Sequence, residues 1–209
     1  MKYEEYVQTK RLKTTSNGIN PEHLNENLFD WQVPVVRWAL NKGQACLFED
    51  CGLGKTIQQL AWAEQIPGKV LILTHLAVAE QTEREAAKFG IDASVRRDGT
   101  CPDQITITNY EQIHQFDFDE FSGIVLDESS ILKSQTGKIR TEIMNRSVQI
   151  PYRLACTATP APNDHIELGN HAEFAGAMLM QEMLARFFVH DAAKTQDWRL
   201  KGHARADFW

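Results

Sequence analysis

The residue types and the spacing that suit phosphate chemistry occur together in one short stretch, Gly52-Leu53-Gly54-Lys55-Thr56. A triphosphate is bound by several backbone N–H groups that converge at a helix N-terminus, and glycines let the backbone approach it closely. Lys55 would place its charge at the β- and γ-phosphates, and the Thr56 hydroxyl would ligate Mg²⁺. The stretch, extended to Ile57, therefore predicts a loop that binds a magnesium-bound nucleotide.

One position departs from the strict form of this loop. The pattern G-x-x-x-x-G-K-[ST] has its first glycine six residues before the lysine, where this chain has Glu49. A glycine-rich turn between a strand and a helix, beside an incidental surface lysine, is the other interpretation. The loop by itself does not decide between the two, so a second element must confirm it.

A pair of carboxylates supplies that second element. Asp127 and Glu128 directly follow the apolar run 123–126, and ligands of parallel α/β sheets bind at the carboxyl ends of the strands. Asp127 would hold Mg²⁺, directly or through water, and Glu128 would orient or deprotonate the water that attacks a phosphoanhydride. An acidic pair at a helix start, favoured by the helix dipole, is the alternative, and the phosphate-binding loop makes it the less favoured one.

The elements that must position these residues alternate along the chain, which is typical of a parallel sheet covered by helices. Strands are expected at 45–48, 69–74, 92–95, 105–108, 123–126 and 152–157. Helices are expected at 34–40, 57–64, 76–89, 109–114, 136–150, from 163 or 164 to 174, and at 176–189. We therefore predict an α/β fold with a mainly parallel sheet and helices on both faces.

Length and charge limit the function classes. The chain has 209 residues and a formal net charge of −6. This length suits one sizeable core and is too short for two full nucleotide-binding lobes. The negative charge argues against a surface made mainly to hold a nucleic-acid backbone, so any nucleic-acid contact is expected to be local or shared with another segment.

The sequence gives little support to a metal site, to disulfides or to a membrane location. The four cysteines contain no C-x-x-C pair, and three of them lie in or beside apolar runs, which favours small buried residues in a reducing cytoplasm over zinc ligands or disulfides. His165 and His171 lie near Glu167 without H-E-x-x-H spacing, which gives metal binding there little support. No signal segment opens the chain, and no apolar run approaches the roughly 20 residues of a membrane span. We expect a soluble, cytoplasmic protein with no membrane partner.

Three motifs resemble those of superfamily 2 helicases. Asp127-Glu128-Ser129-Ser130 resembles motif II, and Thr157-Ala158-Thr159-Pro160 resembles motif III. The loop at 52–56 is similar to motif I of the Swi/Snf branch, whose members commonly have an acidic pair before the glycines, as Glu49-Asp50 stands here. The resemblance implies a RecA-like P-loop NTPase domain that binds ATP and Mg²⁺, with Thr157 and Thr159 as coupling residues. Strand propensity is the other interpretation of the two threonines.

Weaker resemblances extend this pattern over roughly residues 28–189. Gln32 resembles the glutamine of the adenine-reading Q motif, with Phe29 or Trp31 available to pack nearby, and an exposed glutamine at a helix start is the equally weighted alternative. Residues 71–74 are similar to motif Ia and residues 106–111 to motif Ib. Residues 161–170 look like the version of this segment in phage and prophage DEAD-like helicases.

The motifs divide the chain into three parts. Residues 1–27 form a lead-in, residues 28–189 a RecA-like ATP-binding lobe, and residues 190–209 a basic-aromatic tail. Related motors use two RecA-like lobes, and the second brings arginines that stabilise transition-state charge. No second strand–helix series is expected after Val189, so we expect an N-terminal lobe cut from a longer protein, or a truncated one. Its tail would face a missing second lobe or stack on single-stranded nucleic acid.

The resemblance implies the ATP-binding lobe of a nucleic-acid-dependent ATPase, either a helicase or a double-stranded DNA translocase, with DNA favoured over RNA. Lys55, Asp127 and Glu128 are the expected catalytic residues, and Thr56 and Asp127 the expected Mg²⁺ ligands. The isolated lobe is expected to bind nucleotide with little turnover. The alternative is a non-catalytic, nucleotide-gated module that docks to a separate partner lobe or nuclease. A small-molecule kinase is disfavoured by the motif set.

Overall fold

The computed structural model describes residues 16–133, 137–162, 164–190 and 198–208. At its centre is a six-stranded sheet in the order β1-β6-β5-β2-β4-β3, and every pair of neighbours is parallel. The strands are β1 (Gln44–Phe48), β2 (Lys69–Thr74), β3 (Ala93–Val95), β4 (Ile105–Asn109), β5 (Phe121–Asp127) and β6 (Tyr152–Thr157). The predicted α/β class and parallel sheet are confirmed.

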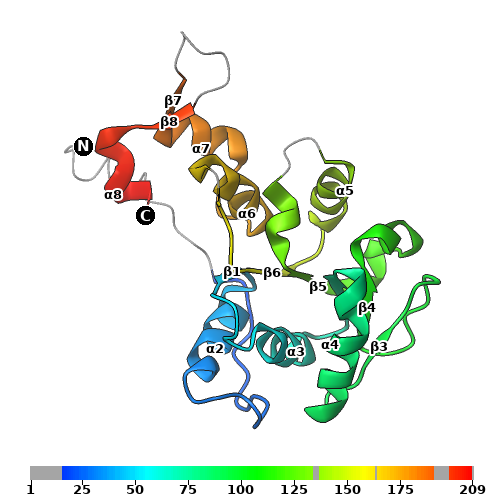
Figure 1. Ribbon diagram of the computed structural model, residues 1–209. Helices are drawn as coiled ribbons and strands as arrows, with labels where there is room; N and C mark the ends of the chain where they lie inside the picture. Colours follow the sequence, from blue (N-terminus) through cyan, green and yellow to red (C-terminus); the bar gives the residue numbers. More distant parts are fainter. Residues whose placement is uncertain (1–15, 134–136, 163, 191–197, 209) are drawn as a thin grey trace.

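Helices cover both faces of this sheet (Figure 1). One face carries α2 (Gln32–Lys42), α3 (Lys55–Gln65) and α4 (Leu76–Lys88). The other carries α5 (Lys138–Ser147), α6 (Leu168–Phe174) and the short 3-10 segment η3 (Ser129–Lys133). Two further 3-10 segments, η1 (Tyr110–Gln115) and η2 (Phe118–Glu120), follow β4, where one or two helical turns were expected.

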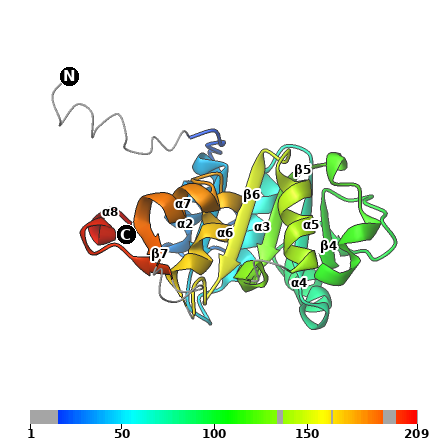
Figure 2. The same cartoon turned by 90° about the horizontal axis from the view of Figure 1, so that it is seen from above.

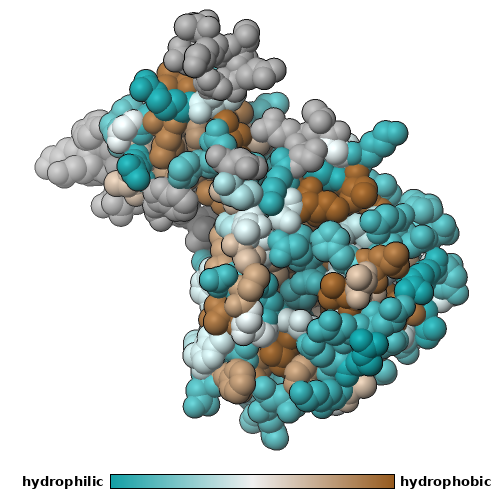
Figure 3. All heavy atoms as spheres, viewed as in Figure 1, coloured by the Kyte–Doolittle hydropathy of each residue, from teal (hydrophilic) through white to brown (hydrophobic). Residues whose placement is uncertain are grey.

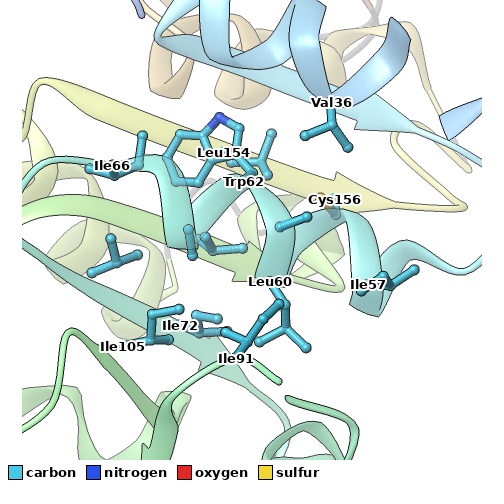
Figure 4. Packing of buried hydrophobic residues seen from close by; sticks show 14 of the residues in the cluster. Val36, Ile57, Leu60, Trp62, Ile66, Ile72, Ile91, Ile105, Leu154 and Cys156 are labelled. Atoms are coloured by element: carbon cyan, nitrogen blue, oxygen red, sulfur yellow. The ribbon is translucent and has the colours of Figure 1, made fainter. Parts of the chain in front are cut away.

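The strand sequences are continuously apolar because both faces of the sheet are buried. In β2, Val70 and Ile72 belong to the core shared with α2, α3 and α4, whereas Leu71 and Leu73 belong to the core on the opposite face. Trp62 of α3 is fully buried in the first core, as Figure 4 shows. Each fully buried Val, Leu or Ile side chain contributes roughly 1.5–3 kcal/mol relative to exposure, so the paired cores fix the sheet between its helices.

The described part of the lead-in packs on the helices of the first face. The backbone N–H groups of Gly18 and Ile19 donate to the carbonyl oxygens of Asn41 and Leu40, at 3.1 and 2.9 Å. A Cβ at Gly18 would lie 1.8 Å from the Leu40 carbonyl oxygen, so this close approach requires glycine. The segment thereby closes over the C-terminal end of α2.

The expected helix over 176–189 is wrong at both ends. Gly176 has a φ of 63° and Leu179 is extended, so the helix α7 spans only Met180–Phe187. The chain then enters β7 (Phe188–His190), which pairs antiparallel with β8 (Trp198–Leu200). An apolar helical pattern at 176–189 did not reveal this change, because Phe188 and Val189 suit a strand equally well.

The chain after α7 forms a small unit beside the β1 side of the sheet (Figures 1 and 2). It continues through η5 (Gly202–Ala204) to α8 (Arg205–Phe208). The Phe208 ring lies edge-on to Phe187 and Phe188, with centroid distances of 5.4 and 5.6 Å. The short 3-10 segment η4 (His165–Glu167) precedes α6, and Asp164 caps it as expected, whereas Asn163 lies outside the described residues.

The surface seen in Figure 3 is mostly hydrophilic, with apolar side chains in separate patches. Within the described ranges, none of the helices combines the length and the apolar character needed to cross a bilayer.

Candidate nucleotide-binding site

The loop between β1 and α3 has the backbone that two glycines permit. Gly52 and Gly54 have φ values of 84° and 68°, and Gly54 immediately precedes the first residue of α3. A Cβ at Gly52 would meet nothing within 4 Å, so its dihedral angle, not space, favours glycine there. A Cβ at Gly54 would lie 2.7 Å from Nε2 of Gln32. The loop is therefore open at Gly52 and tightly supported at Gly54.

Lys55 directs its ammonium group across this loop. Its Nζ donates to the carbonyl oxygens of Glu49 and Asp50, at 3.0 and 2.9 Å. Thr56 is half-buried beside it, Leu53 is exposed and Ile57 is buried in the core. A cation, a hydroxyl and the free N–H groups of a helix start thus lie within three consecutive positions, the donor set that a nucleotide phosphate requires.

Glu49 stands where the strict pattern has its first glycine, and its side chain does not block the loop. Its carboxylate accepts a hydrogen bond of 2.7 Å from Nε2 of Gln58, in the first turn of α3. The same amide donates to the Leu53 carbonyl oxygen at 3.2 Å. The glutamate side chain is therefore tied to α3, and the departure from the strict pattern has a structural explanation.

Gln32 supports the loop from behind. Its side chain is fully buried, so the interpretation as an exposed helix-start glutamine is wrong. Its Oε1 accepts from the Phe29 N–H at 3.0 Å, and its Nε2 donates to the Leu53 carbonyl oxygen at 3.0 Å. Phe29 and Trp31 are 67% and 44% exposed, which leaves their rings accessible. Adenine recognition by Gln32 stays a prediction.

Strand order brings the loop and the acidic pair to one edge of the sheet. Strand β6 lies between β1 and β5, and its last residue, Thr157, pairs with Phe48, the last residue of β1. On its other side Cys156 pairs with Asp127, the last residue of β5. Because all three strands are parallel, their carboxyl ends lie side by side, and the sequence-predicted residues of both motifs meet there.

Asp127 is held by three residues to which the sequence analysis gave no role at the site, although two of them lie in the segments similar to motifs Ia and Ib. Its Oδ1 accepts from Nε2 of Gln59, and its Oδ2 accepts from the Thr74 hydroxyl, both at 2.8 Å. Its backbone carbonyl accepts from the Tyr110 hydroxyl at 2.7 Å. Burial, reinforced by the Asp127 charge, raises the pKa of Tyr110 well above its ordinary value, so the phenol stays a donor. The carboxylate orientation is thereby fixed.

Glu128 stands in an unusual backbone conformation. Its φ is 53°, and within the described ranges no other residue except glycine has a positive φ. The Thr157 hydroxyl donates to its Oε1 at 2.5 Å, and the Thr159 N–H donates to the Thr157 hydroxyl at 3.0 Å. A strained conformation of this kind persists only where neighbours fix it. Both predicted coupling threonines are thus connected to Glu128.

The residues present fit a magnesium ion that is bound mainly by nucleotide and water. Nowhere in the described ranges do three or more His, Cys, Asp or Glu side chains gather as a metal site. Mg²⁺ takes one or two carboxylates together with substrate phosphates and waters, so a cage of protein ligands is not required. Asp127 and Thr56 are the two candidate ligands, and each is half-buried.

A simple signal could have revealed the missed residues. Thr74 ends β2, and Tyr110 directly follows β4. Both therefore stand at the carboxyl edge where ligands bind. Gln58 and Gln59 lie one turn inside the helix that the loop starts. Polar residues at the ends of predicted parallel strands were available from the sequence, but the strand order was not.

Comparison with known proteins adds the fold family. No protein-family model matches the chain, and no curated protein matches its sequence. The SWI2/SNF2 ATPase core of Sulfolobus solfataricus, solved in complex with double-stranded DNA, is similar with a TM-score of 0.66 and 24% identity, over 81% of this chain and 40% of that one. The UvsW helicase of bacteriophage T4 is similar with a TM-score of 0.58 and 14% identity, over 86% of this chain and 66% of that one.

A third similar structure is the helicase domain of Pyrococcus furiosus Hef, with a TM-score of 0.58 and 18% identity, over 70% of this chain and 36% of that one. The chain thus spans from about a third to two thirds of the length of these proteins. The likenesses confirm the expected fold, the RecA-like lobe found in Swi/Snf-type ATPases and helicases.

Proposed function

We propose that the chain is the ATP-binding lobe of a nucleic-acid-dependent ATPase of the helicase or DNA-translocase type. The observation that carries the proposal is the meeting of Lys55, Asp127 and Glu128 at one edge of a parallel sheet, with the start of α3 behind the loop. A cation, a metal-binding carboxylate and a water-orienting carboxylate are the parts that hydrolysis of a nucleoside triphosphate needs.

Each residue has a distinct task in this proposal. The loop N–H groups and Lys55 bind the phosphates, and the amine exchanges its two carbonyl partners for phosphate oxygens. Asp127 and Thr56 hold Mg²⁺, which neutralises charge on the β- and γ-phosphates when it is bound. Glu128, fixed by Thr157, accepts a hydrogen bond from the attacking water and takes its proton.

Nucleic acid, and DNA in particular, is the proposed activator. The support is the likeness to the SWI2/SNF2 ATPase core, whose structure contains double-stranded DNA. The net charge of −6 requires this contact to be local or shared with a second lobe. The non-catalytic alternative is disfavoured because a nucleotide-gated switch has no need of a strained, hydroxyl-bonded Glu128.

Nucleotide binding tests the site directly. Fluorescent ATP is titrated with the protein, with and without Mg²⁺, by anisotropy. Lys55→Ala is expected to weaken binding about 10-fold or more, because it removes a charge-assisted bond to phosphate. Glu128→Gln is expected to bind as the parent does. Lys88→Ala, at the C-terminal end of α4, is the matched lysine control. Equal affinities of the Lys55 and Lys88 variants would refute the site.

A further inference from the structure

A buried histidine contacts both the turn that follows Glu128 and the strand that precedes the loop at 52–56. It is not itself one of the proposed site residues. His171 lies on α6 and is 1% exposed. Its Nε2 is 3.0 Å from the Ser129 hydroxyl oxygen, and its ring stands edge-on to the Phe48 ring at a centroid distance of 5.3 Å. Ser129 directly follows Glu128, and Phe48 directly precedes Glu49. One side chain therefore contacts Ser129, within the motif at 127–130, and Phe48, at the end of the strand that precedes the loop.

His171 also contacts β1 through its backbone carbonyl group. The Cys46 thiol of β1 lies 3.6 Å from the His171 carbonyl oxygen, the distance of a weak S–H···O hydrogen bond. Burial raises the pKa of this thiol to about 12, so it keeps its proton. Residue 171 is thus attached to β1 through its carbonyl and to the turn after β5 through its ring. Its position relative to both strand ends is fixed.

The turn that carries Glu128 needs such support. A positive φ in a glutamate costs on the order of 1–3 kcal/mol and is kept only where the surroundings impose it. Thr157 holds the carboxylate of Glu128, and the next residue, Ser129, is fully buried with its hydroxyl against His171. Asn170, beside His171 on α6, donates to the Leu132 carbonyl oxygen at 2.6 Å. Two neighbouring residues of α6 therefore anchor η3, the segment that begins directly after Glu128.

The imidazole of His171 is suited to form its hydrogen bond in the neutral state. Burial, the largest cause, lowers the pKa of His171 below its ordinary value, and the Lys133 charge acts in the same direction. A neutral imidazole has one donor and one acceptor nitrogen, and a serine hydroxyl can complement either. Ser129 pairs with Nε2 alone, because Nδ1 of the same ring is buried and has no hydrogen-bond partner among the described residues.

We propose that His171 is a positioning residue, which holds Ser129 and thereby keeps Glu128 aligned with the phosphate-binding loop. The proposal rests on the proposed function, because it assumes that Glu128 orients the attacking water. His171 does not touch nucleotide, so its loss slows hydrolysis and leaves ATP affinity unchanged.

The test combines two single variants, their double variant and a conservative replacement. His171→Leu keeps an apolar side chain against Phe48 and removes the hydrogen bond, and Ser129→Ala removes the bond from the other side. His171→Gln retains a polar group that can reach Ser129. Each protein is assayed by single-turnover ATP hydrolysis with protein in excess, by fluorescent-ATP titration, and by hydrogen–deuterium exchange of residues 127–133.

The expected result is a rate about 10-fold lower in both single variants, no further loss in the double variant, and rescue to within about threefold by His171→Gln. Affinity for ATP is expected to stay as in the parent protein. Amide exchange is expected to accelerate at 127–133 but not in α3, because only the turn after β5 loses a support.

Four outcomes would overturn the proposal. Additive losses in the double variant would show that the two residues act separately. A His171→Gln variant as slow as His171→Leu would show that packing, not the hydrogen bond, is required. Parent-like rates in all variants, together with an inactive Glu128→Gln, would remove this inference and leave the proposed function intact. An active Glu128→Gln would instead withdraw the proposed function and this inference with it.

Discussion

At the scale of single residues, the proposed phosphate-binding loop accommodates Glu49 because the glutamate carboxylate points away from the loop. The bond to Gln58 turns that carboxylate toward α3, and only the backbone carbonyl of Glu49 faces Lys55. The requirement at the two remaining glycines is stricter, because each has a left-handed backbone conformation. The loop is therefore defined by its dihedral angles more than by its side chains.

Alanine substitutions at three glycines separate these effects. Gly52→Ala is expected to lower the free energy of unfolding by about 1–2 kcal/mol through its positive φ alone. Gly54→Ala is expected to cost more and to weaken ATP binding, because its Cβ would also displace the Gln32 amide. Gly202→Ala, with open space around it, is the control and should change stability by less than about 0.5 kcal/mol. Urea denaturation measures all three, and equal losses would contradict this account.

Cysteine reactivity reports on the same loop. Cys51 is exposed in it, whereas Cys46 is shielded and its pKa is raised by burial to about 12. Burial likewise raises the pKa of Cys156 well above its ordinary value. Because the thiolate is the reactive form, iodoacetamide at pH 8 is expected to modify Cys51 first.

Peptide mass spectrometry over time gives the order of modification, and Mg-ATP is expected to slow the reaction at Cys51. Cys51→Ser is the control and should remove the fast phase. A faster reaction at Cys46 than at Cys51 would contradict the burial that the structure assigns.

At the scale of elements, the position of a polar side chain along its strand determines whether it contributes to the candidate site. Thr74 at the end of β2 binds Asp127, whereas Thr106 near the start of β4 is fully buried and its hydroxyl has no hydrogen-bond partner in the part of the chain that the structure describes. A threonine at a strand end therefore contributes to the site. A threonine buried within a strand lowers the stability of the fold, since an unpaired buried hydroxyl is unfavourable.

Threonine-to-valine substitutions test this difference at equal volume. Thr74→Val is expected to lower the free energy of unfolding by about 1.5–3 kcal/mol, because a bond to a charged carboxylate is lost. It is also expected to raise the Mg²⁺ concentration needed for ATP binding. Thr106→Val is expected to be neutral or to stabilise by about 1 kcal/mol. Urea denaturation and Mg²⁺ titration are the measurements, and a Thr106→Val variant less stable than Thr74→Val would refute the argument.

At the scale of the whole molecule, the site occupies one edge of a single sheet. Lys55 is the one cation among the described residues assigned to it, whereas charge on a transferring γ-phosphate is usually stabilised by an added arginine as well. The 209 residues are therefore expected to bind Mg-nucleotide and to hydrolyse it slowly, with little stimulation by DNA. A coupled ATPase assay with and without DNA measures this, with Lys55→Ala as the background. Fast DNA-stimulated hydrolysis by this chain would contradict the prediction.

The sequence by itself determined the α/β class, the six strands and the two motifs at strand ends, because apolar periodicity and glycine patterns are local. The boundaries of the C-terminal elements were the exception. Residues 188 and 189 satisfy a helix and a strand equally, and only pairing with 198–200 decides for the strand.

The tertiary structure alone decided which side chains support the site. Gln59, Thr74 and His171 bind residues between 42 and 68 positions away, and no local pattern encodes such partners. They follow from the strand order, which places β5 between β6 and β2, and from the packing of α3 and α6 on the two faces of the sheet. Glu128, whose φ is positive, is likewise bound by a distant residue, because the Thr157 hydroxyl donates to its carboxylate from 29 positions away.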